Sequence, residues 1–204
     1  MAEFSESTRS LVLASGNQGK LRELDAMLAP VGWTVMPQIE WGISEAVEDG
    51  LSFIENAIIK ARHASEHTGL PALGDDSGLV VDILGGAPGI FSARFSGAAA
   101  DDSSNIRKLL AELGGLPESD RGAHFYCAMA LVRHAHDPAP LLATGRWNGR
   151  IMEESAGTGG FGYDPVFWVP THNCSSAELP AKVKNQISHR GKALSVMMEQ
   201  MAGL

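Results

Sequence analysis

The sequence contains little cysteine, with only Cys127 and Cys174 among 204 residues. Neither belongs to a Cys-x-x-Cys pair, which argues against a disulfide framework and against a cysteine zinc site of that spacing. Cys127 lies in an apolar run and is expected to be a buried thiol. This cysteine usage is typical of a reducing, cytoplasmic setting.

Long apolar runs are also missing. No stretch approaches the roughly 20 apolar residues that a membrane-spanning helix needs, so no membrane partner is expected. Residues 1–10 contain Glu3, Glu6 and one basic residue, Arg9, without an apolar stretch, so we do not expect them to be a signal peptide. We expect residues 1–10 to form a flexible N-terminus and residues 11–204 to form a single domain.

Positive charge is in the minority. The 16 Lys and Arg residues face 24 Asp and Glu residues, and the formal net charge is -8. This balance, together with the lack of interleaved basic and aromatic residues, argues against a nucleic-acid partner. An acidic protein can still hold a small anion in a local basic cleft.

The sequence does contain a pair of adjacent acids between two apolar runs, in the stretch 73–84. Asp75 and Asp76 are followed by Ser77 and Gly78, which we interpret as a turn that displays both carboxylates where a loop opens. Metal-binding carboxylates are often presented in this way. A solvated turn without any ligand is the alternative interpretation of these four residues.

A phosphate site is suggested by the turn from Ser15 to Lys20. Residues 11–14 predict a short buried strand before it, and residues 21–28 carry leucines at helical spacing after it. Backbone amides and the helix dipole attract an anion at such a helix start, and Lys20 adds a mobile charge. The spacing is not that of a Walker A loop. A strand-to-helix connection without a ligand is the alternative.

A second helix is predicted to begin after Ser52, which fits a capping box with Glu55. Lys60 lies on this helix, and the chain then returns to the strand that carries Asp76. Glu48, just before the helix, could therefore reach the same site as Asp76, with Lys60 beside them. Spacing alone makes this only one possibility.

The middle of the chain predicts framework elements. A helix is expected from Asp101 to Leu113, where aliphatic residues recur at i, i+3, i+4 and i+7, and we expect it to pack the core and nothing more. Residues 123–132 and 141–147 predict two strands of an antiparallel hairpin.

Two later segments are candidates for ligand contact. Residues 157–162 match G-x-G-x-x-G, but strand-like sequence follows them where a dinucleotide fingerprint requires a helix. We interpret them as a flexible loop that lets Phe161 approach a flat ligand, with a packing aromatic as the alternative. The last segment carries Lys184, His189 and Arg190 close to a helix start capped by Ser188.

This inventory favours phosphoryl or nucleotidyl chemistry. Carboxylates at Glu48, Asp75 and Asp76, without a Cys or His cluster, suit Mg²⁺, which usually shares its shell with substrate phosphates. In such reactions the protein positions the substrate, offsets its charge and supplies a base to water.

Six sequence blocks resemble the inosine triphosphate pyrophosphatase family, whose bacterial members are dITP/XTP pyrophosphatases. They appear in the order of the family and span nearly the whole chain from Leu11. The blocks are Ser15-Gly16-Asn17-x-x-Lys20, Glu55-Asn56-Ala57-x-x-Lys60-Ala61, Asp75-Asp76-Ser77-Gly78-Leu79, Pro88-Gly89-x-x-Ser92-Ala93-Arg94, Gly160-Phe161-Gly162-Tyr163-Asp164-Pro165-x-Phe167 and Ser188-His189-Arg190-Gly191-Lys192-Ala193.

The resemblance implies hydrolysis of non-canonical purine nucleoside triphosphates (ITP, dITP and XTP) to the monophosphate and pyrophosphate. It implies an α/β fold with a long mixed β-sheet and flanking helices, two lobes with a cleft between them, and a homodimer. By motif, Asp76 would be the proton acceptor, and Glu48 and Asp76 would bind Mg²⁺. The substrate-binding residues would be Ser15, Gly16, Asn17, Gln18, Gly19, Lys20, Lys60, Ser77, Phe161, Gly162, Tyr163, Asp164, Lys184, His189 and Arg190.

Two departures and two rival functions accompany the resemblance. Ser15 stands where threonine is common, and Gly74 stands where alanine is frequent. Among the residues assigned by motif, Glu48 matches the family pattern least specifically, because several acids surround it. The rival functions are a magnesium-dependent pyrophosphatase with a broader substrate range and a nucleotide-binding sensor without turnover.

Overall fold

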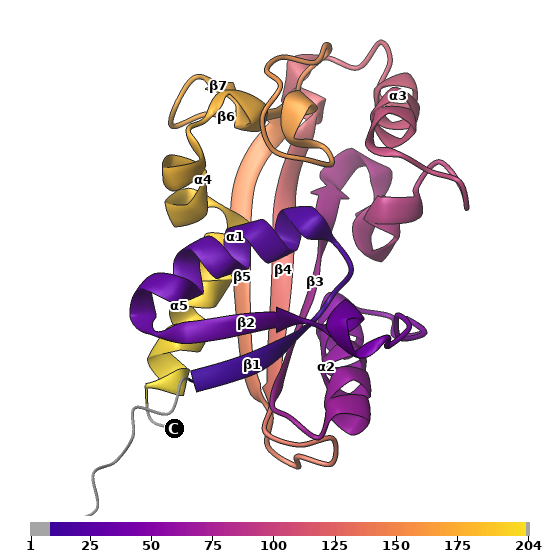
Figure 1. Ribbon diagram of the computed structural model, residues 1–204. Helices are drawn as coiled ribbons and strands as arrows, with labels where there is room; N and C mark the ends of the chain where they lie inside the picture. The colour runs from indigo at the N-terminus through magenta and orange to yellow at the C-terminus, as the bar shows by residue number, and fades with distance from the viewer. Residues whose placement is uncertain (1–8, 203–204) are drawn as a thin grey trace, which may run out of the picture.

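The computed structural model describes residues 9–202, and the expected flexible N-terminus therefore falls mostly outside the described residues. The described part contains a seven-stranded mixed sheet in the order β2-β1-β3-β4-β5-β6-β7 (Figure 1). The strands are β1 (Arg9–Ala14), β2 (Trp33–Pro37), β3 (Ala72–Val81), β4 (Gly122–Val132), β5 (Leu141–Ile151), β6 (Phe167–Val169) and β7 (Cys174–Ser175). The fold class predicted from the sequence, an α/β fold with a mixed sheet and flanking helices, is confirmed.

The sheet is mixed because β1 is parallel to both of its neighbours, β2 and β3, whereas the later strands pair antiparallel. The α-helices of the described part are α1 (Gln18–Leu28), α2 (Phe53–Thr68), α3 (Asp102–Glu112), α4 (Ala181–Ile187) and α5 (His189–Met201). A short 3₁₀ helix, η4 (Gly89–Arg94), lies between β3 and α3. None of the helices in residues 9–202 is long and apolar enough to cross a membrane.

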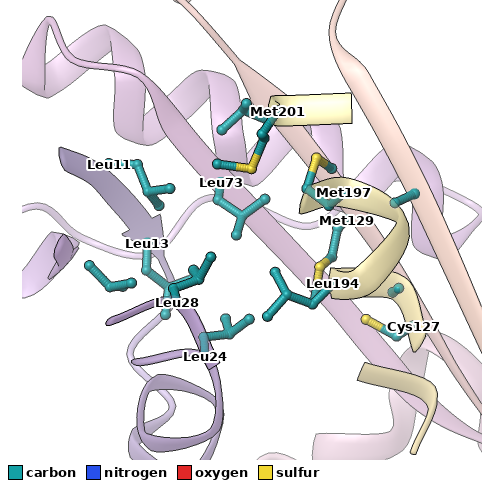
Figure 2. Packing of buried hydrophobic residues seen from close by; sticks show 14 residues of the cluster. Leu11, Leu13, Leu24, Leu28, Leu73, Cys127, Met129, Leu194, Met197 and Met201 are labelled. Atoms are coloured by element: carbon teal, nitrogen blue, oxygen red, sulfur yellow. The ribbon is translucent and has the colours of Figure 1, made fainter. Parts of the chain in front are cut away.

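Alternation along the strands divides the core between the two faces of the sheet. Leu11 and Leu13 of β1 join a cluster with leucines of α1 and with Leu194 and Met197 of α5 (Figure 2). Val12, between the two leucines, faces the opposite way and packs with alanines of α2. Helices α1 and α5 therefore cover one face, and α2 covers the other.

A third cluster lies toward the far ends of β3, β4 and β5. It combines Leu79 and Val81 of β3 with Leu109 of α3, with Leu113 directly after α3 and with Phe167 of β6. In Figure 1 α3 and the β6–β7 region accordingly lie at the same end of the long strands.

The helix starts follow their capping residues. The side chain of Ser52 accepts a hydrogen bond from the Glu55 amide, and the side chain of Ser188 accepts one from the Gly191 amide. Asp101 and Ser104 form a reciprocal capping box at the start of α3. Each cap satisfies backbone donors that the first helical turn leaves free, so these boundaries are local in origin.

The expected turn at Ser77-Gly78 is wrong, because β3 continues through both residues to Val81. Strand β4 pairs with β3 at every position from Ala72 to Val81. Gly78 has a packing role, since a Cβ there would lie 2.5 Å from the carbonyl oxygen of Gly89 in η4. The two acids therefore lie inside a paired strand, and successive side chains must point to opposite faces of the sheet.

Candidate active site

A pocket gathers residues from most of the predicted blocks. Its lining comes from the end of β1, the middle of β3, α2 and the segment before it, η4, the start of α3, residues 161–164 and the α4–α5 region. All predicted site residues line it except Gly16, Gln18 and Gly19. Segments distant in sequence thus meet around one pocket.

The predicted phosphate turn forms the start of α1. Asn17 is the N-cap, and its side chain accepts a hydrogen bond from the Lys20 amide at 3.0 Å. The Ser15 hydroxyl accepts one from the Asn17 amide at 3.1 Å. Gly19 is buried against Phe161, and a Cβ at this position would lie 2.6 Å from the aromatic ring. Gly19 therefore supports the aromatic residue and does not line the pocket.

Asp75 is fully buried on the face of β3 that α1 and α5 cover. Its carboxylate lies 2.7 Å from Lys20 Nζ and 2.8 Å from Arg190 Nε. Burial by itself raises the pKa of Asp75, but the attraction of Arg190 and then Lys20 outweighs it and holds the pKa well below the usual value. Asp75 is therefore a charged anchor for two cations that line the pocket.

Asp76 points to the other face and into the pocket. Its Oδ1 lies 2.7 Å from Lys60 Nζ, whereas Oδ2 is buried and has no hydrogen-bond partner in the described part of the chain. Burial raises the pKa of Asp76, and the opposing attraction of Lys60 and Lys20 does not cancel that increase. Asp76 thus offers a buried acceptor oxygen with increased affinity for a proton.

Glu48 shares Lys60 with Asp76. The distance from Glu48 Oε1 to Lys60 Nζ is 2.9 Å. Burial lowers the pKa of Lys60, but the attraction of Asp76 and hydrogen bonds to both carboxylates outweigh burial and raise it. The two carboxylates thus share one ammonium group. Glu45 lines the same pocket, so the segment before α2 supplies more than one acid.

The donor set fits a hard divalent cation that shares its shell with a ligand. Within residues 9–202 no group of three or more His, Cys, Asp and Glu side chains is arranged to hold a metal. Asp76 and Glu48 nevertheless lie close together through Lys60, and Asp76 Oδ2 lacks a partner among the described residues. Mg²⁺ is commonly held by one or two carboxylates together with water and substrate phosphates.

A second buried ion network joins α1 to α4 and α5. Arg190 contacts Glu23 and lies 2.7 Å from the Ser77 hydroxyl, in addition to Asp75. Lys184 Nζ lies 2.9 Å from Glu23 and 2.6 Å from Asp164. Glu23 was not predicted. Its only sequence signal is that it follows Lys20 by three residues, on the same helical face.

Aromatic groups form a flat recess beside this network. The His189 ring stacks on Phe125 with a centroid distance of 4.8 Å and an interplanar angle of 12°. Burial, followed by the nearby Arg190 charge, holds the pKa of His189 well below its usual value, so the imidazole is neutral at neutral pH. The Phe161 ring lies 5.0 Å from Lys184 Nζ. A planar heterocycle fits such surroundings.

The start of α3 contributes to the pocket, so the expectation that this helix only packs the core is wrong. Asp102 and Asn105 line the pocket, and Asp102 accepts a hydrogen bond from the Gly162 amide at 2.7 Å. Tyr163 donates to the carbonyl of Ser92 in η4 at 2.9 Å. The glycine-rich segment is therefore tied to both α3 and η4.

These features define a nucleotide-binding α/β protein, because carboxylates suited to a metal, a helix start with lysine and an aromatic recess share one pocket. The chain belongs to the Ham1 family, which matches residues 11–200. This membership confirms the resemblance carried by the six blocks.

Similar proteins cover nearly the whole chain. The dITP/XTP pyrophosphatase of Vibrio parahaemolyticus is 54% identical over 95% of this chain and 97% of its own length. The protein of the same name from Escherichia coli O157:H7 is 53% identical over 95% of this chain and 98% of its own. Among solved structures, a HAM1 protein from Coxiella burnetii has a TM-score of 0.88 and 46% identity, covering 96% of this chain and 100% of that one.

Proposed function

We propose that this protein hydrolyses deaminated purine nucleoside triphosphates (ITP, dITP and XTP) to the monophosphate and pyrophosphate. The similarity to dITP/XTP pyrophosphatases supports this assignment, because it extends over nearly the full length of both chains. The single structural observation that carries it is Asp76, which lines a pocket with three lysines and an aromatic recess and whose buried Oδ2 lacks a partner in residues 9–202.

In this mechanism Asp76 is the proton acceptor. It takes a proton from a water molecule whose oxygen forms a bond to the α-phosphorus, while the bond from that phosphorus to the bridging oxygen breaks and pyrophosphate leaves. Lys60 and Lys20 offset the phosphate charge. Burial raises the pKa of Asp76, which strengthens its carboxylate as a base.

Mg²⁺, held by Glu48 and Asp76, would neutralise charge on the triphosphate when it is bound. Both carboxylates contact the Lys60 ammonium group, which would offset phosphate charge beside them. Ser15 and Asn17 would orient the phosphates from the α1 start.

Base selection would depend on donors that face the 6-oxo group of hypoxanthine or xanthine. The neutral His189 and the backbone amides near Phe161 are candidates, whereas the Arg190 nitrogens already donate to Asp75, Glu23 and Ser77. Adenine presents an amino group at this position and would leave such donors unpaired. Sites built on that kind of pairing reject the wrong partner by about 10⁴-fold.

A substrate panel tests the function. Turnover of ITP, dITP, XTP, GTP, ATP and dUTP is measured with and without Mg²⁺, and the products are identified as monophosphate plus pyrophosphate or diphosphate plus phosphate. Efficient turnover restricted to the first three supports the proposal. Comparable turnover of dUTP or GTP favours a broader pyrophosphatase, and ITP binding without product favours a sensor.

The Asp76→Asn variant tests the proton acceptor. Loss of a general base lowers turnover by about 10²- to 10⁴-fold, and the unfolding midpoint stays close to that of the wild type. Asp82→Asn is the matched control, because Asp82 is a largely exposed acid outside the pocket. An Asp76→Asn variant with nearly full activity would remove Asp76 from this role.

We further propose that the protein is a homodimer, as the family resemblance implies. Size-exclusion chromatography with light scattering tests this proposal. A mass close to 43 kDa, twice the 21.6 kDa of one chain, is the expected result. A mass of one chain at micromolar concentration would contradict it.

A further inference from the structure

Arg94 differs from the other cations that line the pocket. Four of them have a carboxylate oxygen within hydrogen-bond distance, at 2.7 Å for Lys20, 2.7 Å for Lys60, 2.6 Å for Lys184 and 2.8 Å for Arg190. Arg94 Nη1 lies 3.9 Å from Glu48 Oε2, and no shorter ion pair involves Arg94 in the described residues. Its side chain is 43% exposed and lines the pocket.

The backbone that carries Arg94 is held from two sides. Ser92 Oγ accepts a hydrogen bond from the Leu79 amide of β3 at 2.9 Å. Asn105 Nδ2 of α3 donates to the carbonyl oxygen of Ala93 at 3.1 Å. The guanidinium carbon lies 5.1 Å from the centroid of the Phe91 ring. Arg94 is therefore preorganised, since its backbone is anchored and a ring supports its planar head group.

Glu48 connects Arg94 to the chemistry of the pocket. The same carboxylate contacts Lys60 through Oε1 and faces Arg94 through Oε2. A divalent cation held by Glu48 and Asp76 would make Glu48 less available to its cationic neighbours. Arg94 then lacks its one nearby counter-charge among the described residues, and a guanidinium in this state is well suited to a bidentate contact with phosphate oxygens.

The aromatic residues suited to the base and the arginine suited to phosphate have different neighbours in the pocket. Phe161 and His189, which suit the base, contact Lys184, Arg190 and Phe125. Arg94 instead lies beside Glu48, which Lys60 joins to Asp76. A triphosphate with its base at the aromatic recess and its α-phosphorus at Asp76 would extend its last two phosphates toward Arg94.

We propose that Arg94 binds the β- and γ-phosphates of the substrate and stabilises them as they depart as pyrophosphate. This inference rests on the proposed function and adds a residue to its leaving-group side. The bond that breaks leaves new negative charge on the pyrophosphate oxygen, and Arg94 supplies donors where that charge develops. No proton transfer by Arg94 is involved.

Product inhibition separates this role from a general loss of binding. Ki values for inorganic pyrophosphate and for IMP are measured during ITP turnover with Mg²⁺ for the wild type, Arg94→Gln and Arg94→Lys. Loss of a charge-assisted contact raises the pyrophosphate Ki of Arg94→Gln by about 10- to 100-fold. The IMP Ki stays within about twofold of the wild-type value. Arg94→Lys gives an intermediate pyrophosphate Ki, because lysine keeps the positive charge but cannot make the bidentate contact of a guanidinium group.

Arg107→Gln is the matched control, since Arg107 is an exposed arginine of α3 that does not line the pocket. Its two Ki values and its unfolding midpoint should match those of the wild type. An unchanged pyrophosphate Ki in Arg94→Gln, or equal increases in both Ki values, would overturn the role of Arg94.

Calorimetric titration of the protein with inorganic pyrophosphate and Mg²⁺ gives a readout that needs no turnover. The wild type binds pyrophosphate more tightly than Arg94→Gln by the same factor as in the inhibition assay. If the wild type does not hydrolyse ITP, the proposed function fails, whereas equal pyrophosphate binding by both proteins refutes the role of Arg94 alone.

Discussion

Asp75→Asn probes the buried ion network behind the pocket and gives the largest stability effect that we expect from a single change there. Asp75 has no exposed side-chain surface and pairs with Lys20 and Arg190. An asparagine has nearly the same shape but carries no charge, so the variant removes the attraction and leaves two cations that this carboxylate no longer neutralises. Removing one partner of a buried pair typically costs about 3 to 5 kcal/mol.

The lower part of that range applies here, because Arg190 keeps its contacts with Glu23 and Ser77. We therefore expect the free energy of unfolding to fall by about 3 kcal/mol. For a chain of this size 1 kcal/mol shifts the melting temperature by about 2 to 4 °C, so the midpoint should fall by roughly 6 to 12 °C. Urea denaturation followed by circular dichroism measures the first quantity, and thermal melts measure the second.

The pH dependence supplies an independent check on the same change. Asp75 has a depressed pKa in the folded state, so its contribution to stability is present above the unfolded value of about 3.9 and is lost as the pH falls below it. The stability gap between the wild type and Asp75→Asn should be constant from about pH 5 to 8. Below about pH 4 it should shrink by up to roughly 1.4 kcal/mol per pH unit.

The exposed Asp82 provides the control, since Asp82→Asn should change the stability by less than about 0.5 kcal/mol. If Asp75→Asn were no more destabilising than this control, or if the gap persisted unchanged at pH 3, the buried network would not have the energetic role argued here.

Three further changes test other parts of the pocket. Chelation of divalent cations should abolish ITP turnover without moving the unfolding midpoint, and Mg²⁺ should restore activity; full activity after dialysis against chelator would contradict a metal role. Gly19→Ala places a Cβ 2.6 Å from the Phe161 ring, so KM for ITP should rise several-fold in steady-state assays while kcat changes less; an unchanged KM would show that this ring does not contact the base. Tyr163→Phe leaves the buried carbonyl of Ser92 without its donor and should cost about 1 to 3 kcal/mol in urea unfolding, and a neutral result would mean that water replaces the hydroxyl.

Much of the framework could be predicted because its causes are local. The apolar run at residues 11–14 and the long runs at residues 123–132 and 141–147 are strands, and β4 and β5 pair antiparallel as expected. Ser52 and Ser188 cap helices through hydrogen bonds within three residues. Such signals depend on neighbours in sequence, so no tertiary information is needed to interpret them.

The predicted turn at Ser77-Gly78 was wrong because contacts with a distant part of the chain, and not local sequence, decide its conformation. Serine followed by glycine is a common turn sequence, but the pairing of β3 with β4 decides the local conformation. That pairing joins residues about 50 positions apart, Ser77 with Cys127 for instance, and nothing in residues 73–84 reveals it. Tertiary contacts override local preference in this stretch.

The site likewise combines residues that local motifs predict with residues that only tertiary packing reveals. The motif residues meet in one pocket, but Glu23, Asp102 and Arg94 were not among the predicted site residues. Glu23 lies in the middle of α1 and Asp102 at the start of α3, and acids at such helix positions are ordinary and usually solvated. Only the packing of α1 against α5, and of α3 against the glycine-rich segment, gives these carboxylates a cation or an amide to contact.

The continuity of β3 explains how two neighbouring aspartates come to differ. In a turn, Asp75 and Asp76 could both face the pocket, and their like charges would compete for the same cations. In a strand, Asp75 must face α1 and α5, where Arg190 and Lys20 depress its pKa. Asp76 must face α2, where burial raises its pKa despite the attraction of Lys60 and Lys20. Environments that separate the pKa values of paired carboxyl groups assign them different roles. The pleat of β3 therefore makes one aspartate a permanent structural charge and leaves the other available to exchange a proton.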